Sequence, residues 1–330
     1  MRLSKDDADL TKVLKFSSFS DLSKIGSGSY GVVFKAKYKG VHDVALKKVL
    51  YHNESEGFPL SSIREIRLLT TLDHPNIVKM FGVINDPARQ HNNWTLTFYI
   101  VFEYCNWDLA NLLMNKSITI LDSEIKHMLQ QVLTGLSYLH SKNVLHRDLK
   151  SSNILVNKNG ALKICDFGLS KRVAYDKNGN LKKSLTNRVV TVWYRAPELL
   201  LGEKYYDSGI DMWSVACIMA EMWKRCPALP GKSEQNQLNL IMELCGSITP
   251  INWPQVEKFP LYKALVLDQN LPRSVSQKYQ EIIECPNALD LLERLFTLDP
   301  KRRIDANTAL SHPYFFVNPE PEPFFMESPF

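Results

Sequence analysis

The sequence predicts an α+β protein with two lobes, a small β-rich lobe followed by a larger and mainly α-helical one. Residues 20–50 alternate apolar and polar side chains around glycines, a pattern typical of strands and hairpins. From residue 109 onward the apolar side chains recur at helical spacing instead. The chain has 330 residues with 45% hydrophobic content, which is enough material for two cores.

The β-rich lobe is expected to contain one helix. Over residues 60–72, Leu60, Ile63 and Ile66 recur at helical spacing behind Pro59, which predicts an amphipathic helix beginning near Ser61. Residues 94–101 then predict a strand. Residues 103–106 form a short connector into helical pattern, and we place the lobe boundary there.

Two long helices are expected in the second lobe, over residues 123–140 and 211–223. The second is apolar nearly all round, which predicts burial at the centre of the lobe. Residues 318–330 are rich in proline and cannot continue a helix. This tail is expected to be extended or disordered unless it packs onto the lobe.

Composition excludes some classes of function. The formal charge of +5 is mild, and acidic and basic residues are interleaved, so no direct nucleic-acid binding is expected. Six cysteines without a Cys-X-X-Cys pair predict reduced, mostly buried thiols in an intracellular protein. No run of eighteen apolar residues occurs, and we expect neither a signal peptide nor a membrane span.

The strongest chemical signal is the sequence His-Arg-Asp-Leu-Lys-Ser-Ser-Asn at residues 146–153, followed by Asp-Phe-Gly at residues 166–168. Asp148 offers a carboxylate that can accept a hydroxyl proton, and Lys150 offers a cation for phosphate. An amide oxygen at Asn153 and a carboxylate at Asp166 suit a metal ion. These are the groups that phosphoryl transfer needs. A solvated loop could carry either motif by chance, but both motifs in this order favour the chemistry.

A glycine pattern precedes these motifs. Residues 26–33 fit Gly-X-Gly-X-X-Gly-X-Val between two strands, and glycines let a backbone approach phosphates closely. A plain glycine hairpin and a dinucleotide fingerprint each explain the pattern alone. A dinucleotide fingerprint should open into a helix, whereas strand pattern continues here, so a phosphate-covering hairpin is favoured.

Lys47 lies on the next expected strand, and Glu65 lies eighteen residues later in the expected helix. Their pairing would aim the lysine at phosphates and would explain why a sheet lobe contains a helix. The alternative is an ordinary exposed glutamate. Residues 166–198 form a polar segment with hydroxyls and many basic side chains, which is either a lid that a phosphate orders or a passive surface loop.

Together these residues resemble the eukaryotic protein kinases over about residues 19–316. The resemblance implies the bilobal protein kinase fold, with ATP and Mg²⁺ as cofactors. It implies an N-terminal extension over 1–18 and a kinase domain over 19–316. The domain would comprise an N-lobe over 19–103 and a C-lobe over 106–316, followed by a proline-rich tail over 317–330.

The resemblance also implies roles for individual residues. Asp148 would be the catalytic base, Lys150 would steady the γ-phosphate, and Lys47 with Glu65 would orient ATP. Asn153 and Asp166 would hold Mg²⁺. Phe102 would be the gatekeeper of the adenine pocket. The implied nucleotide-binding residues are Ile25, Gly26, Gly28, Gly31, Val33, Ala45, Lys47, Phe102, Glu103, Tyr104, Cys105, Asp108, Asn153, Leu155 and Asp166.

Two structural contacts are implied as well. Glu198 would pair with Arg303, and Asp211 would support the loop that carries Asp148.

Residues 58–66, Phe-Pro-Leu-Ser-Ser-Ile-Arg-Glu-Ile, resemble the PSTAIRE-type helix of cyclin-dependent kinases, which a cyclin pushes into place. This implies a heterodimer with a cyclin bound through the 58–70 helix and the N-lobe. Residues 47–50, 56–59, 186–191, 220–223 and 244–250 further resemble the elongation branch, whose members form positive transcription elongation factor b with cyclin T. A nuclear kinase that promotes transcription elongation is therefore expected. Its expected substrates are Ser/Thr-Pro sites in RNA polymerase II C-terminal domain repeats and in elongation factors.

Regulation and substrate binding are implied at further positions. Phosphorylated Thr186 would be clamped by Arg64, Arg147 and Lys171. Lys171 stands where the family usually has arginine, and lysine lacks the bidentate fork, so the neighbouring Arg172 is the alternative. Tyr30 stands where elongation kinases usually carry phenylalanine and cell-cycle kinases carry an inhibitory tyrosine. It is therefore a further candidate regulatory site.

The implied substrate-binding residues are Val190, Thr191 and Arg195. A strained backbone at Val190 is expected to leave its carbonyl unpaired, which would favour a substrate proline.

Two other functions are consistent with the same motifs. One is a cell-cycle or other transcriptional cyclin-dependent kinase. The other is a pseudokinase scaffold that binds a cyclin, which the intact Lys47, Asp148, Asn153 and Asp166 disfavour.

Overall fold

The computed structural model describes residues 14–28, 31–50, 58–87, 96–177, 181–187 and 189–325. The chain divides into two compact units. Unit 1 comprises the chain up to Asn106 together with Cys165–Leu169, and unit 2 comprises Trp107–Ile164 and the chain from Ser170 onward. Each unit is described by itself.

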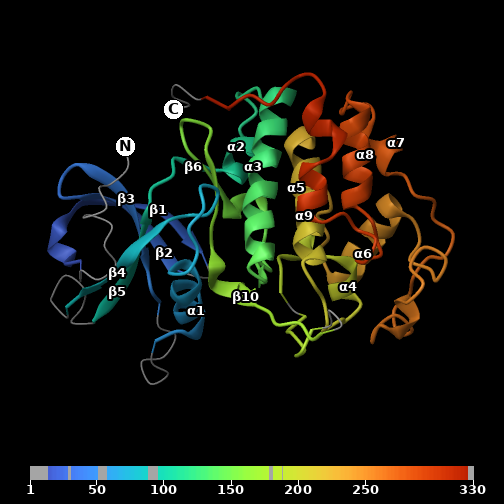
Figure 1. The fold of residues 1–330 in the computed structure, drawn as a ribbon, viewed down its shortest axis with the longest axis horizontal. Coiled ribbons are helices and arrows are strands. Elements are labelled where there is room, and N and C mark those ends of the chain that lie inside the picture. The colour runs from blue at the N-terminus through green and yellow to red at the C-terminus, as the bar shows by residue number, and fades with distance from the viewer. Residues whose placement is uncertain are drawn as a thin grey trace. The chain divides into compact units, whose positions relative to one another are not determined.

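Unit 1 is built on a five-stranded antiparallel sheet with the order β1-β2-β3-β5-β4 (Figure 1). The strands are β1 (Phe19–Gly28), β2 (Gly31–Tyr38), β3 (His42–Lys48), β4 (Met80–Asp86) and β5 (Thr97–Glu103). The predicted helix is α1 (Leu60–Leu69), which packs against the short 3₁₀ turn Phe167–Leu169. The α+β fold with a sheet-based first unit is therefore confirmed, although the strand predicted over 94–101 begins at Thr97 among the described residues.

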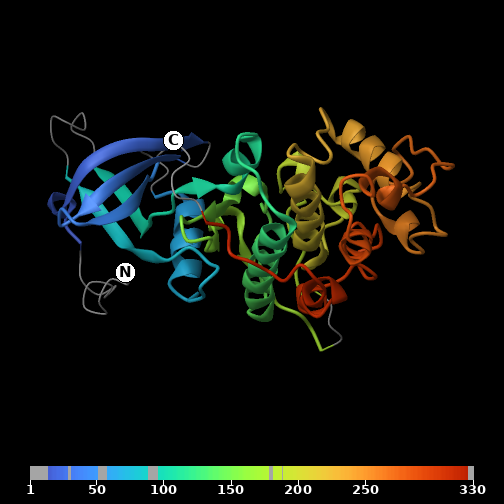
Figure 2. The ribbon, with the colours of Figure 1, turned by 90° about the horizontal axis from the view of Figure 1, so that it is seen from above.

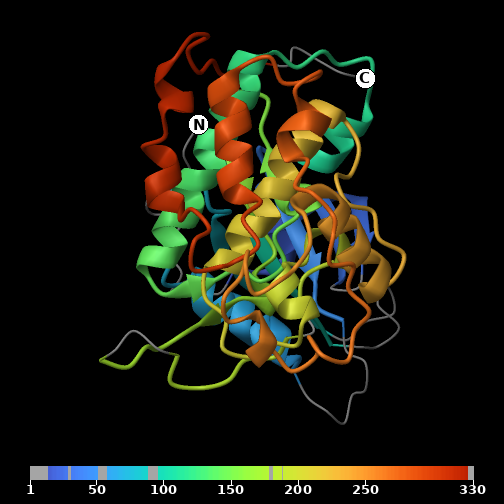
Figure 3. The ribbon, with the colours of Figure 1, turned by 90° about the vertical axis from the view of Figure 1, so that its right-hand side faces the viewer.

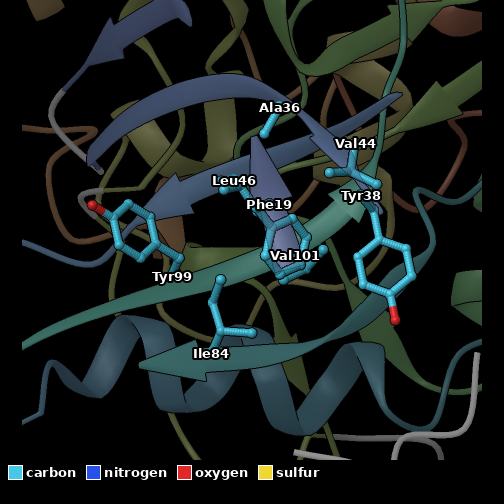
Figure 4. Packing of buried hydrophobic residues seen from close by; sticks show 8 residues of the cluster. All are labelled: Phe19, Ala36, Tyr38, Val44, Leu46, Ile84, Tyr99 and Val101. Atoms are coloured by element: carbon cyan, nitrogen blue, oxygen red, sulfur yellow. The ribbon is translucent and has the colours of Figure 1, made fainter. Parts of the chain in front are cut away.

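Successive side chains of a strand point to opposite faces of the sheet, and the apolar side chains of unit 1 lie together on one face. Figure 4 shows the side chains of Phe19, Ala36, Tyr38, Val44, Leu46, Ile84, Tyr99 and Val101 gathered together. Val44 and Leu46 of β3 are buried, and the intervening Ala45 and following Lys47 are only partly buried. The period of two therefore turns Lys47 away from this core.

The amphipathic pattern of α1 has an unexpected outcome. Leu60 is 76% exposed and Ile63 is 37% exposed, whereas Glu65 is 2% exposed. Leu68 and Leu69 supply the buried apolar contacts. The buried face of the helix therefore includes Glu65, which pairs with Lys47 of the sheet, and the apolar positions 60 and 63 lie on the exposed side.

Unit 2 is mainly α-helical (Figures 1 and 3). Its helices are α2 (Leu109–Met114), α3 (Asp122–Ser141), α4 (Pro197–Leu200), α5 (Gly209–Lys224), α6 (Glu234–Cys245), α7 (Val275–Tyr279), α8 (Pro286–Leu295) and α9 (Ala306–Leu310). Two small sheets, β6-β8-β9 and β7-β10, use the strands β6 (Trp107–Asp108), β7 (Val144–Leu145), β8 (Ile154–Val156), β9 (Leu162–Ile164) and β10 (Lys171–Arg172).

Helix α5 lies at the centre of unit 2, in contact with both α3 and α8. Every residue from Gly209 to Met222 is buried, which confirms the burial predicted from its uniformly apolar pattern. The helix ends at Arg225, which adopts a left-handed conformation with φ 58°. The Arg225 side chain donates to the carbonyls of Leu112 and Leu113 at the end of α2, with distances of 3.2 and 2.8 Å.

The proline-rich tail packs onto unit 2 over residues 317–325, running along α3 (Figure 2). Lys126 of α3 donates its ammonium to the carbonyl oxygens of Val317 (2.7 Å) and Pro319 (2.6 Å). Phe324 is 3% exposed, and a Cβ at Gly160 would lie 2.5 Å from its carbonyl oxygen. Of the two forms expected for the tail, this part is extended and docked.

We predict that Lys126→Met lowers the free energy of unfolding by about 1–3 kcal/mol, because it leaves two carbonyls of the docked tail without their donor. Lys116→Met is the matched control, since Lys116 is exposed on the loop after α2. Urea unfolding followed by tryptophan fluorescence measures both variants. Equal stability of the two variants would show that the tail does not depend on Lys126.

All six cysteines lie in the described part of the chain and are free thiols. Only Cys217 and Cys245 are buried, so the expectation of mostly buried thiols is wrong. Within the described ranges, no helix combines the length and apolar character that crossing a membrane requires.

Candidate active site

Asp148 lies in the loop at residues 146–153, which follows β7 in unit 2, and both of its carboxylate oxygens accept hydrogen bonds. Oδ1 accepts from the Thr191 amide (3.1 Å) and hydroxyl (3.2 Å). Oδ2 accepts from Lys150 Nζ (3.0 Å) and Asn153 Nδ2 (3.3 Å). Asp148 is therefore fixed in orientation and 3% exposed. This is the arrangement expected of a positioned proton acceptor.

Asp211, in the first turn of α5, supports this loop from within unit 2. Its Oδ2 accepts from the His146 amide and its Oδ1 from the Arg147 amide, both at 2.9 Å. His140 Nε2 lies 2.9 Å from Oδ2. Burial alone would raise the pKa of Asp211, but the hydrogen bond and charge of His140 and the loop amide of Arg147 outweigh burial and hold this pKa below its ordinary value. The predicted support by Asp211 is confirmed.

A pH dependence of stability follows from the depressed pKa of Asp211. The stabilising contribution of a carboxylate whose folded-state pKa is lowered is fully present above its unfolded-state pKa, here about 4. That contribution is lost as the pH falls through the lower folded-state pKa. We predict that Asp211→Asn lowers the free energy of unfolding by about 3 kcal/mol at pH 7, and that the difference from wild type shrinks below pH about 4. Urea unfolding between pH 7 and pH 3 measures it, and a difference that does not change with pH would contradict this origin.

Unit 1 brings Lys47, Glu65 and Asp166 together. Lys47 Nζ lies 2.9 Å from both carboxylate oxygens of Glu65 and 3.1 Å from Asp166 Oδ1. The predicted pair of Lys47 and Glu65 is therefore present. Burial disfavours the lysine cation, but the carboxylates of Glu65 and Asp166 outweigh it and raise the pKa of Lys47.

One cation thus faces two carboxylates in unit 1. Burial is the main reason that the pKa of Glu65 is raised, and the charge of Asp166 adds to it. The cluster therefore carries surplus negative charge, which a bound cation would neutralise.

Other implied nucleotide-binding positions also lie in unit 1. The sheet register sets Gly26 opposite Val33 and Val33 opposite Lys47, and it sets Ala45 opposite Phe102. Ile25 and Gly28 lie on β1, while Glu103, Tyr104 and Cys105 lead out of β5.

Gly31 at the start of β2 has no room for a side chain. Its φ is 138°, and a Cβ there would lie 2.5 Å from the Lys48 carbonyl oxygen. The turn residues 29 and 30, including the candidate regulatory Tyr30, lie outside the described residues. Glycine at 31 is therefore required by the hairpin itself, whatever it covers.

The remaining implied positions belong to unit 2. Asp108 and Leu155 are neighbours across the β6–β8 pair. Asp108 also caps α2, accepting from the Asn111 amide at 2.9 Å and from its side chain at 2.6 Å. The predicted pair of Glu198 and Arg303 is confirmed, with distances of 2.8 and 3.0 Å in a fully buried setting.

Comparisons with known proteins agree with this geometry. A family model described as "Protein kinase domain" matches residues 19–315. Cyclin-dependent kinase 9-A of Xenopus laevis is 46% identical over 310 residues, covering 92% of this chain and 82% of the relative. Cyclin-dependent kinase 9 of Homo sapiens is 46% identical over 306 residues, with the same shares. The chain belongs to the cyclin-dependent protein kinases. The expected family is therefore confirmed.

A solved structure extends the comparison to the fold. A chain of the structure titled "Crystal Structure of the yeast RNA Pol II CTD kinase CTDK-1 complex" matches with a TM-score of 0.84 and 35% sequence identity. The match covers 96% of this chain and 99% of that chain. This cyclin-dependent kinase is therefore a protein serine/threonine kinase with the protein kinase fold, and its family uses ATP and a divalent metal ion.

The donor set of this kinase fits a hard divalent cation. In unit 1, Asp166 Oδ2 has no hydrogen bond from any described residue, while Oδ1 faces Lys47. In unit 2, Asn153 Nδ2 donates to Asp148, and the side-chain oxygen of Asn153 remains available to a metal ion. Among the described residues, no three His, Cys, Asp or Glu side chains form a metal cage. Magnesium bound with nucleotide takes few protein oxygens and completes its shell with phosphates and water, and each unit offers one oxygen donor of this kind.

The activation segment of the kinase, residues 170–198 of unit 2, presents Thr186 to solvent. Thr186 Oγ1 lies 3.4 Å from Arg147 Nη1. Lys171 and Arg172 are exposed on β10, which pairs with β7. Arg64 belongs to unit 1, where it donates to the Gly168 carbonyl at 3.0 Å.

Val190 of the same segment corrects one expectation. Its backbone is left-handed, with φ 68°, as the resemblance implied. Its carbonyl is not unpaired, because Arg195 donates to it from Nη2 (3.0 Å) and Nε (3.2 Å). Arg195 also pairs with Glu234 through Nη1 at 2.6 Å. Thr191, which is expected to bind substrate, donates to Asp148 Oδ1 through the contacts given above.

Sequence reasoning missed two polar networks beneath the loop. Tyr194 donates its hydroxyl to Glu221 Oε2 (2.7 Å), and Ser151 donates to Glu221 Oε1 (3.1 Å). Burial raises the pKa of Glu221. Tyr206 contacts Arg147 and Thr186. The only sequence signal was the glutamate at 221 in the apolar second half of helix α5, and the tyrosines resembled ordinary packing residues.

Proposed function

We propose that this kinase, with a cyclin bound, transfers the γ-phosphate of ATP to Ser/Thr-Pro sites of the RNA polymerase II C-terminal domain and of elongation factors. In this way it would promote transcription elongation in the nucleus. The relatives named cyclin-dependent kinase 9 and the structural relative titled an RNA Pol II CTD kinase support the proposal. A T-type cyclin is the proposed partner, because the sequence resembles the elongation branch.

The observation that carries substrate class is the backbone of Val190. Because Arg195 already occupies the Val190 carbonyl, an N–H in the substrate residue after the phosphorylated one would lose its water without gaining an acceptor there. Proline has no N–H and avoids that cost. Sites followed by proline are therefore favoured.

The residues divide the chemistry between them. Bound Mg²⁺·ATP supplies the phosphoryl group and charge neutralisation. Asp166 and Asn153 would hold the metal ion, and Lys47, aimed by Glu65, would hold the α and β phosphates. Lys150 would balance charge on the γ-phosphate. Asp148 would accept the substrate hydroxyl proton, oriented by Thr191 and Lys150.

Cyclin control would act through α1. Its exposed Leu60 and Ile63 offer an apolar surface for a cyclin on the 58–70 segment. The same helix carries Glu65, so its seating would set the Lys47 contact. Phosphorylation of Thr186, which faces Arg147, would provide the second control, with Arg64, Lys171 and Arg172 as further candidate ligands of that phosphate.

The test compares two heptad peptides that differ only at the residue after the acceptor serine, proline or alanine. With cyclin T and Mg²⁺·ATP, we expect kcat/KM for the proline peptide to exceed that for the alanine peptide by about tenfold or more, since an unsatisfied buried amide costs about 1–3 kcal/mol. Equal values would refute the role of the Val190 carbonyl in substrate choice.

The alternative is a cell-cycle kinase of the same family. Its sequence support was Tyr30, which lies outside the described residues. Affinity purification from nuclei distinguishes the two functions, because the elongation kinase should retain a T-type cyclin. Recovery of only cell-cycle cyclins would favour the alternative.

A further inference from the structure

Tyr206 connects the loop that carries Asp148 to the activation segment of unit 2. Its hydroxyl lies 2.6 Å from the Thr186 carbonyl oxygen and 3.1 Å from Arg147 Nη1. The side chain is 3% exposed. The Leu185 amide, next to Thr186, donates to the Lys204 carbonyl at 2.8 Å, so the segment is held at two consecutive residues.

The direction of each Tyr206 hydrogen bond is fixed by chemistry. A guanidinium can only donate, so the Tyr206 oxygen accepts from Arg147, and its single proton goes to the Thr186 carbonyl. Burial raises the pKa of Tyr206, against the charge of Arg147, so the hydroxyl keeps that proton at neutral pH. Both hydrogen-bonding capacities are thus used in joining these two residues.

The hydrogen bonds of Tyr206 to Arg147 and Thr186 are present without a phosphate on Thr186. The Thr186 hydroxyl is exposed and faces the same nitrogen of Arg147, at 3.4 Å. A phosphate there would present three acceptor oxygens to the guanidinium. Before phosphorylation, the Tyr206 hydroxyl makes the shorter contacts to both Arg147 and Thr186.

Tyr206 can affect turnover, because the two segments that it joins both contain residues that position Asp148. The Arg147 amide, next to Asp148, is held by Asp211. Thr191, five residues after Thr186, donates two hydrogen bonds to Asp148. A segment released at Thr186 would loosen the donors that orient the proton acceptor.

We propose that Tyr206 is a positioning residue that holds the activation segment on Arg147 before Thr186 is phosphorylated, and that it thereby sets the basal rate of the kinase. The inference rests on the proposed regulatory role of Thr186. It predicts that losing the Tyr206 hydroxyl harms the unphosphorylated enzyme more than the phosphorylated one.

The test uses Tyr206→Phe, which keeps the ring and removes the hydroxyl. Tyr205→Phe is the matched control, since Tyr205 is adjacent and 63% exposed. Each variant and the wild type are prepared unphosphorylated and fully phosphorylated at Thr186, with saturating cyclin. We measure kcat on a Ser-Pro peptide, and the rate of trypsin cleavage at Lys182 and Lys183 of the unphosphorylated forms.

For Tyr206→Phe we expect kcat of the unphosphorylated enzyme to fall about tenfold, with faster cleavage, and kcat of the phosphorylated enzyme to fall less than about threefold. The activation ratio therefore rises, while Tyr205→Phe changes neither rate by more than about twofold. Equal losses of kcat in the two forms would show that Tyr206 has only a structural role. No loss of kcat in either form would show that its hydroxyl has no role. Either result would refute the proposal.

Two further outcomes are separable. Equal wild-type rates with and without phosphate would refute the regulatory role of Thr186, while the unphosphorylated Tyr206→Phe rate still tests the contact itself. If Tyr206→Phe does not fold, hydrogen exchange of the wild type decides. We expect the Leu185 amide to be protected without phosphate, and free exchange there would overturn the proposal.

Discussion

Asp148→Asn is expected to lower kcat by about 10²- to 10⁴-fold while leaving the affinity for ATP unchanged. The substitution preserves shape but removes the group that accepts the substrate proton. It also places an amide NH₂ among the donors from Thr191 and Lys150, where a carboxylate accepts from all of them. The loss should therefore appear in turnover and not in nucleotide binding.

Single-turnover phosphate transfer and ATP titration measure the two quantities for Asp148→Asn. Asp268→Asn is the matched control, because Asp268 is exposed and its Oδ1 accepts only a loop amide, from Asn270 at 2.9 Å. An amide oxygen can keep that bond. Retained turnover in Asp148→Asn would remove Asp148 from the role of proton acceptor.

Lys47→Met is expected to lower kcat/KM by about 100-fold or more, which is the usual cost of removing a preorganised charge from a transition state. The substitution also leaves Glu65 and Asp166 facing each other without the cation that now lies 2.9 and 3.1 Å from them. The two carboxylates would then repel each other and the anionic phosphates, so the site would hold the phosphates less well.

Lys48→Met is the control for Lys47→Met, since Lys48 is the next residue of β3 and points to the other face of the sheet. Steady-state rates over a range of ATP and Mg²⁺ concentrations measure both variants. Similar losses in the two would mean that the sheet, and not the contact between Lys47 and Glu65, is what matters.

The sequence predicted the parts of the site that short motifs specify. Asp148, Lys150 and Asn153 come together because they lie within one loop. The contact between Lys47 and Glu65 was predicted because it explains why a sheet lobe contains a helix. The fold class followed from two clear periods, alternation before residue 50 and helical spacing after residue 109. The burial of the central helix α5 was predicted because the helix is apolar nearly all round.

Several contacts between distant residues lie outside these motifs and could not be predicted. The tail docks through Lys126, which is 191 residues away from Val317, and proline content only excludes helix there. Leu60 and Ile63 are exposed while Glu65 is buried against Lys47, and helical spacing alone does not specify which face of the helix is buried. The pairing of the Val190 carbonyl with Arg195 depends on loop geometry, which composition does not specify.

Phosphate transfer from ATP to a polymerase heptad peptide by the purified chain, with and without cyclin T, tests the proposed function most directly. We expect Mg²⁺-dependent transfer to serine before proline that rises steeply when cyclin T is added. Equal and negligible rates with and without cyclin T would contradict it.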